Sequence, residues 1–165
     1  MNNVDKIASQ IRLFPKGKQE NIIAELKEKQ RKNDKLHRGE LMQLKEYLYY
    51  VADELTYSKP KQLKIGGVEQ NFGTSWTDFT VHCVKQFVKN GYIKENFKSF
   101  ALKSGKVILT TSMSVEFDHI FKKVSPFCYV DTKFNAHDHI QNLIYIMEYL
   151  GVDEEIELSI YRNNR

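Results

Sequence analysis

The clearest pattern of apolar and polar positions lies near the C-terminal end of the 165-residue chain. Apolar side chains recur there every three or four positions up to Gly151, which predicts a helix over residues 136–150. Asn135 can cap this helix, because its side chain can accept a hydrogen bond from a free backbone N–H of the first turn. Asp138 adds negative charge at the positive helix end. After Gly151, residues 156–162 alternate between apolar and polar, which predicts a half-buried strand.

A second helix begins where Ser75 is followed three positions later by an acidic residue, the arrangement of a capping box. Its broad apolar face continues to Asn90-Gly91, a pair that is typical of a helix C-terminus. Residues 106–111 and 126–131 are rich in β-branched and aromatic side chains, which predicts two further strands.

These elements divide the chain into two predicted parts. Residues 62–162 are predicted to form an α+β domain, with a small sheet of three or four strands and two main helices. Within it, residues 115–121 fit a short helix or a strand equally well. Residues 1–58 are predicted to be a helical, hairpin-like segment. A linker is predicted over residues 57–62, where Pro60 stops any helix and the composition turns polar.

The N-terminal part is predicted to contain three helices. The first ends near Phe14-Pro15. The second runs from about residue 18 to residue 32 and is either interrupted at Asn33-Asp34 or continues through Gly39 into the next helix. The third covers residues 41–55, where leucines alternate steps of three and four, the spacing of a helix-packing seam. This seam and its tyrosines predict an interface with a protein partner or between two copies of the chain. The residues predicted for the interface are Leu41, Leu44, Tyr47, Leu48 and Tyr50.

Positive charge is concentrated in the N-terminal third, although the net charge of the chain is only +4. Residues 1–64 contain 14 Lys or Arg and 9 Asp or Glu, whereas residues 65–165 contain 11 and 12. A basic helix is typical of proteins that contact phosphates. The alternative is a solvated helix whose charges pair with one another, for example Glu28 with Lys32. The residues predicted to bind nucleic acid are Lys16, Lys18, Lys27, Arg31, Lys32, Lys35 and Arg38.

Residue types that often carry catalysis are present, but their spacing does not favour it. His137 and His139 lie two positions apart, about 200° around a helix, so they are not predicted to share a metal ion. Cys83 and Cys128 lie in apolar patterns and are predicted to be buried and reduced. We therefore predict no catalytic residue, no metal site and no cofactor.

The apolar runs of the chain are short. None approaches the roughly 20 residues of a membrane span, and the first residues lack the long apolar stretch of a signal peptide. The sequence therefore predicts no membrane contact and a cytoplasmic location.

The segment 132–143, with the strand 127–131 before it, resembles the C-terminal module of bacterial restriction- and phage-defence-associated proteins. In that module a Tyr-Val strand is followed by Thr-Asn-Leu-Ser-Ala-Asn-Asp-Ile-Ile, a helix and a closing strand. The helix start at Ser75 is similar to the beginning of the module, so the match covers roughly residues 62–162. The resemblance implies an accessory or recognition domain that acts beside a separate catalytic one. The matching positions are Thr132, Ala136, Asp138, Ile140 and Asn142, with Asn135 in place of the usual capping Ser.

Charge pattern and resemblance together favour a non-enzymatic binding or accessory protein of a bacterial defence or mobile-element system. It is predicted to contact nucleic acid, or a nucleic-acid-handling protein, through its basic N-terminal helices. One alternative is a protein inhibitor or adaptor that docks by its helices onto a defence enzyme. Another is a small metal-dependent nuclease that uses Asp118, Asp131 and the neighbouring histidines.

Overall fold

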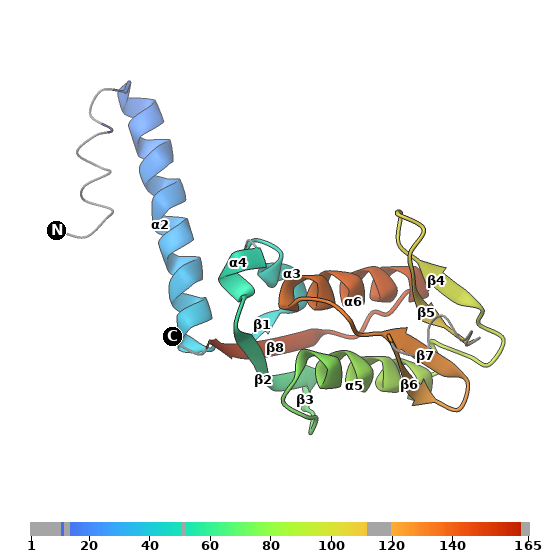
Figure 1. Ribbon diagram of the computed structural model, residues 1–165. Helices are drawn as coiled ribbons and strands as arrows, with labels where there is room; N and C mark the ends of the chain where they lie inside the picture. Colours follow the sequence, from blue (N-terminus) through green and yellow to red (C-terminus); the bar gives the residue numbers. More distant parts are fainter. Residues whose placement is uncertain (1–10, 12–13, 51, 112–119, 163–165) are drawn as a thin grey trace. The chain divides into compact units, whose positions relative to one another are not determined.

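Two compact units, Met1–Glu40 and Leu41–Arg165, make up the chain in the computed structural model (Figure 1). The first predicted helix and most of the ambiguous segment 115–121 lie outside the described residues. The structure describes residues 11, 14–50, 52–111 and 120–162.

The Met1–Glu40 unit contains the long helix α2, Lys16–Arg38 (Figure 1). It begins directly after Pro15, whose fixed φ and missing N–H suit the start of a helix. It ends at Gly39, which adopts a left-handed φ of 63° and donates its N–H to carbonyls of the last turn. The helix therefore continues through Asn33, but it ends at Gly39 and does not run on into the next predicted helix, so neither sequence alternative matches it in full.

The Leu41–Arg165 unit contains two four-stranded antiparallel sheets, with strand orders β1-β8-β2-β3 and β4-β5-β7-β6 (Figure 1). The strands are β1 Met42–Gln43, β2 Ser58–Ile65, β3 Val68–Glu69, β4 Ser99–Ala101, β5 Val107–Thr110, β6 Phe121–Ser125, β7 Cys128–Asp131 and β8 Ile156–Arg162. The helices among the described residues of this unit are α3 Leu44–Tyr47, α4 Ala52–Leu55, α5 Trp76–Lys89 and α6 Ala136–Leu150.

The predicted α+β class is confirmed, and α6 and β8 have the predicted bounds. The number of strands is larger than predicted, because the strands form two sheets instead of one. The C-terminal strand β8 lies in the interior of the first sheet, between β1 and β2. The alternation of apolar and polar residues depends on neighbours in the sequence and does not reveal which distant strands pair. The number of sheets could therefore not be predicted from the sequence.

The predicted linker over residues 57–62 is wrong, because most of it belongs to β2. β2 pairs with β8 along its length, and a shift of register follows Pro60. A proline has no N–H to donate to the ladder and is tolerated at such an irregularity. The two compact units divide between Glu40 and Leu41, not near residue 60.

The predicted continuous helix over residues 41–55 is also wrong. Met42–Gln43 forms β1 against β8, and only the four-residue helices α3 and α4 follow. Leucines at steps of three and four are compatible with two short helices packed on a core as well as with one long helix. The local spacing therefore did not distinguish the two arrangements.

The five residues predicted for the interface differ in their exposure to solvent. Leu44, Tyr47 and Tyr50 are buried in the core, at 3%, 0% and 5% exposure. Leu41 is half-buried, and Leu48 is 37% exposed. Three of the five side chains therefore pack inside the unit instead of facing a partner.

Helices α5 and α6 pack against each other, and α5 also contacts β2 of the first sheet and β6 and β7 of the second. Both helices are capped as predicted. The Ser75 side chain accepts a hydrogen bond from the Asp78 N–H at 3.0 Å, and the Asn135 side chain accepts one from the Asp138 N–H at 2.8 Å. Gly151 ends α6 with a left-handed φ of 67°. The apolar faces of the two helices form the centre of the core that joins the sheets.

Within the described ranges, no helix combines the length and the apolar character that crossing a bilayer requires.

Candidate nucleic-acid interface and the groove beside α6

The seven basic residues predicted to bind nucleic acid all lie on α2. At 100° per residue, five of them fall within an arc of about 100° on one side of the helix, and Lys18 and Lys32 lie outside it. Two acidic residues, Glu20 and Asp34, share that side. The five residues, called the basic stripe below, are Lys16, Lys27, Arg31, Lys35 and Arg38. Four of them are exposed and one, Lys35, is half-buried.

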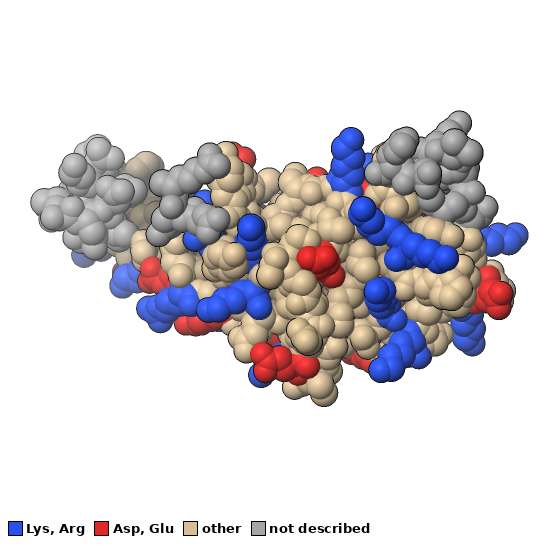
Figure 2. Space-filling view, turned by 60° about the horizontal axis from the view of Figure 1, so that its bottom comes forward, with Lys and Arg blue, Asp and Glu red and all other residues tan. Residues whose placement is uncertain are grey.

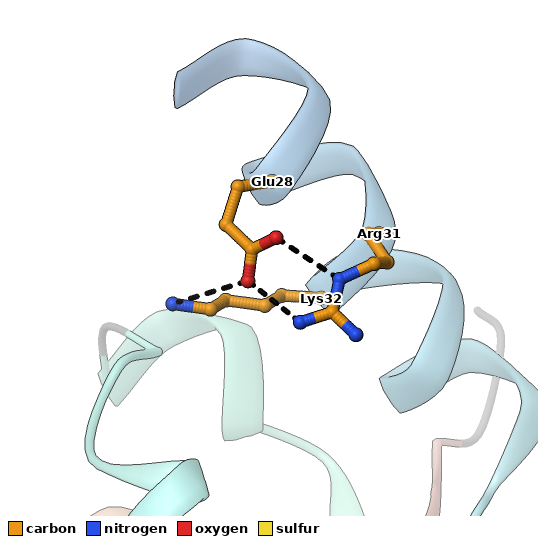
Figure 3. A network of polar contacts seen from close by, with 3 residues as sticks. All are labelled: Glu28, Arg31 and Lys32. Carbon is orange, nitrogen blue, oxygen red and sulfur yellow. Dashed lines mark hydrogen bonds and ion pairs between the residues drawn. The ribbon is translucent and has the colours of Figure 1, made fainter. Parts of the chain in front are cut away.

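Part of the charge on α2 is paired within the helix. The Glu28 carboxylate accepts hydrogen bonds from Arg31 Nε at 3.0 Å and Nη2 at 2.7 Å, and Lys32 Nζ lies 4.0 Å away (Figure 3). The hydrogen bond from Arg31 is the main reason that the pKa of Glu28 is lowered. The internal pairing expected for a solvated helix is therefore present for part of the charge on α2.

The Leu41–Arg165 unit carries a second group of basic side chains. Lys85 and Lys89 of α5 and Lys122 and Lys123 of β6 are exposed, and α5 packs beside β6. On the face of the molecule in Figure 2, lysine and arginine side chains outnumber acidic ones at the end of the unit where the second sheet lies. Since β6 is an edge strand, its lysines also discourage pairing with strands of other chains.

His139 is buried between α5 and α6, at 2% exposure. Its Nδ1 lies 2.7 Å from Thr80 Oγ1, and its ring stacks on Trp76 with centroids 6.3 Å apart. Phe134 meets the same ring edge-on at 6.0 Å. Burial lowers the pKa of His139 from 6.5 to about 4, against the opposing field of Asp131. A neutral histidine held in this way joins two helices and is not available to bind a ligand.

His137, two positions earlier, is separated from His139 by the turn of the helix. Its Nδ1 lies 3.6 Å from the carboxylate of Asp138. In the described part of the chain, no group of three or more His, Cys, Asp or Glu residues is arranged to hold a metal ion.

The two thiols are fully buried. Burial raises the pKa of Cys83 strongly and that of Cys128 to about 12. Because the thiolate is the nucleophilic form, neither side chain is activated for catalysis.

Of the carboxylates named for a nuclease, Asp118 lies outside the described residues. The Asp131 side chain is 1% exposed, lies 3.4 Å from Lys106 Nζ and accepts a hydrogen bond from the Lys133 N–H at 2.9 Å. This carboxylate is therefore engaged in holding the end of β7.

A groove of about 500 Å³, not anticipated from the sequence, lies between α6 and the segment that ends β4. Asn142, Tyr145 and Tyr149 line it from one side of α6. Phe100 and Lys103 line it from the opposite wall. The tyrosine spacing of i and i+4 on α6 is visible in the sequence, but the second wall comes from a segment about forty residues earlier in the chain.

A second groove, of about 430 Å³, shares Tyr149 with the first. Lys94 and Lys98 line it together with further aromatic side chains. The two grooves bring lysines and aromatic rings together, a combination that the basic helix α2 lacks.

In comparisons with known proteins, no family model, no curated protein and no solved structure matches the chain. The resemblance to defence-associated modules therefore stays a prediction.

Proposed function

We propose that this protein is a non-enzymatic binding protein that contacts the phosphate backbone of nucleic acid through the basic stripe of α2. The observation that carries the proposal is the placement of five cationic side chains on one side of a helix about 33 Å long. Lysine and arginine contacts to phosphates provide affinity and orientation without reading sequence. The resemblance described above supports a bacterial defence or mobile-element setting, with the Leu41–Arg165 unit as an accessory domain.

The energetic basis of such contact is the release of counterions. Duplex DNA carries one charge per about 1.7 Å, so a helix of this length faces many phosphates. Each neutralised phosphate releases condensed ions, and affinity falls steeply as salt rises. Glu28 compensates part of the charge of α2, which lowers both the expected affinity and the number of counterions released.

The helix offers a matched pair of double variants as a test. Lys16→Glu with Lys27→Glu reverses two charges of the basic stripe, and Lys18→Glu with Lys29→Glu reverses two charges on the opposite side. All four side chains are exposed, and both pairs are eleven positions apart, so the change in net charge and the spacing are the same. Binding of labelled single-stranded and duplex DNA would be titrated at about 50 mM and about 200 mM salt.

The stripe variant is expected to bind at least about tenfold more weakly at low salt, with a salt slope reduced by about 1.8 for two lost phosphate contacts. The opposite-side variant should lose much less, and circular dichroism should show equal helix content in both. An equal loss in the two variants would contradict a directional stripe. No salt-sensitive binding by the wild-type protein would contradict the proposed function and favour a protein partner.

A further inference from the structure

We infer that the groove beside α6 binds an unpaired base of single-stranded nucleic acid, which stacks on Tyr145 and Tyr149 and bonds to Asn142. The inference rests on the proposed function, because it takes nucleic acid as the ligand, and it deepens that function by naming the single strand. It adds a second site, on the compact unit that does not contain α2.

The groove presents aromatic faces that the fold leaves open. Tyr145 and Tyr149 are 41% and 58% exposed, although both belong to a helix whose other side is deeply buried. The Phe100 ring lies against Tyr149, with centroids 4.6 Å apart and planes tilted by 31°. A volume of about 500 Å³ is in the range of small-ligand sites. Stacking on such rings is available to every base, because every base has a π face.

Asn142 supplies a polar group that lacks a partner. It lines the groove and is only 8% exposed, and its Nδ2 has no hydrogen-bond partner among the described residues. A buried donor left unpaired is costly, so a ligand atom that accepts from it is favoured. Ring nitrogens and carbonyl oxygens of bases are such acceptors, and asparagine pairs with base edges elsewhere. Asp138 and Glu148 line the same groove and can accept from an exocyclic amine of a base.

The lysines around the tyrosines fit a phosphate backbone. Lys103 lies in the wall opposite α6, and Lys94 and Lys98 line the adjoining groove on the other side of Tyr149. A strand that follows the two grooves would place a base on Tyr149 and its phosphates near these lysines. An uncharged apolar ligand would make no use of them, so the charge favours a nucleotide chain.

The groove is expected to distinguish single strands from duplexes, because only a single strand leaves the faces of its bases accessible. In a duplex the faces of the bases are stacked on each other, and extruding one costs free energy. The basic stripe of α2 contacts only phosphates, which both forms expose. Variants in the groove should therefore affect single strands alone, whereas variants of the stripe should affect both forms.

The test is fluorescence anisotropy of the full chain with a labelled oligodeoxyadenylate of about eight nucleotides and with a duplex of the same length. Tyr145→Leu is expected to weaken single-strand binding by between about fivefold and about a hundredfold. Asn142→Leu, a change of similar volume that removes the unpaired donor, should also weaken it at least about fivefold. The matched control is Tyr161→Leu on β8, because Tyr161 is also 41% exposed but lines neither groove. This control should bind like the wild type.

Equal single-strand affinity of the Tyr145→Leu and Tyr161→Leu variants would overturn the groove site while leaving the α2 contact intact. An equal loss of duplex binding in Tyr145→Leu would also overturn it, because a base cannot enter from a closed duplex. If the wild type binds neither oligonucleotide at low salt, the proposed function itself fails. Circular dichroism and thermal unfolding of each variant would confirm that the fold is retained.

Discussion

Lowering the pH is expected to destabilise the folded protein through His139, before most carboxylates are protonated. The side chain is 2% exposed, and burial holds its pKa at about 4, compared with 6.5 when it is solvated. Asp131 and Asp138 favour the charged form but do not offset the burial. Between these two pKa values the unfolded chain binds a proton at His139 and the folded chain does not. The free energy of unfolding must therefore decrease as the pH falls through this window.

The size of the loss follows from the two pKa values. At about pH 7 both states are largely neutral at His139, so the contribution is close to zero. At about pH 5 the unfolded histidine is almost fully protonated and the folded one is not, which removes about 2 kcal/mol of stability. The full difference, reached below about pH 4, is about 3 kcal/mol. Against a typical domain stability of about 5 to 15 kcal/mol, this is a measurable fraction.

The assay is urea unfolding of the wild type and of His139→Gln at about pH 7 and about pH 5, where Asp and Glu are still mostly ionised. The variant has no imidazole at this position, so its loss between the two pH values should be smaller by about 2 kcal/mol. His82, whose pKa is also lowered by burial, contributes equally to both proteins and cancels. The same pH dependence in the variant and the wild type would refute the reasoning, whatever their absolute stabilities.

A buried hydrogen bond, a helix cap and two buried thiols give three further expected outcomes. Tyr47→Phe should lower the free energy of unfolding by about 1 kcal/mol in urea titrations, because it removes the buried 2.6 Å hydrogen bond to the Leu158 carbonyl; an unchanged value would contradict that bond. Asn135→Ala should cost about 1 kcal/mol by removing the cap of α6, and Asn135→Ser should retain most of the stability. Cys83 and Cys128 should resist a thiol reagent at about pH 8 until urea unfolds the chain, since both are buried with raised pKa values. Rapid labelling of the native protein would contradict their burial.

The parts of the fold that the sequence predicts are those whose signals lie within a few residues of each other. Helices α5 and α6 each have a capping side chain, an apolar face and a terminating residue in one continuous segment. In β8, apolar and polar residues alternate from Ile156 to Ile160. The errors fall where distant pairing overrides local signals. Pro60 marks a break in the sequence pattern, but it lies in a strand that β8 stabilises from about a hundred residues away.

The same distinction between local signals and distant contacts applies to the candidate sites. The basic stripe of α2 could be predicted, because a single helix carries all its residues and helical geometry alone places them on one side. The groove could not, because Phe100 and Lys103 meet Tyr145 and Tyr149 only when the second sheet has formed beside α6. The burial of three of the predicted interface residues could not be predicted for a related reason. Exposure cannot be deduced from a leucine spacing, and Tyr47, which looked like an interface residue, is fully buried.

The distribution of charge around the groove would orient the single strand that we propose to bind there. Residues 79–133 contain nine lysines and four acidic residues, whereas residues 134–161 contain six acidic residues and no lysine or arginine. The groove has one wall from each of these segments, since Lys103 belongs to the first and Asp138 and Glu148 belong to the second. A phosphate backbone is attracted to the lysine side and repelled from the carboxylate side. A base on Tyr149 then points its polar edge toward carboxylates that accept hydrogen bonds, while its own phosphate stays with the lysines. The acidic residues that weaken the overall attraction for a nucleic acid would therefore favour one orientation of a bound strand.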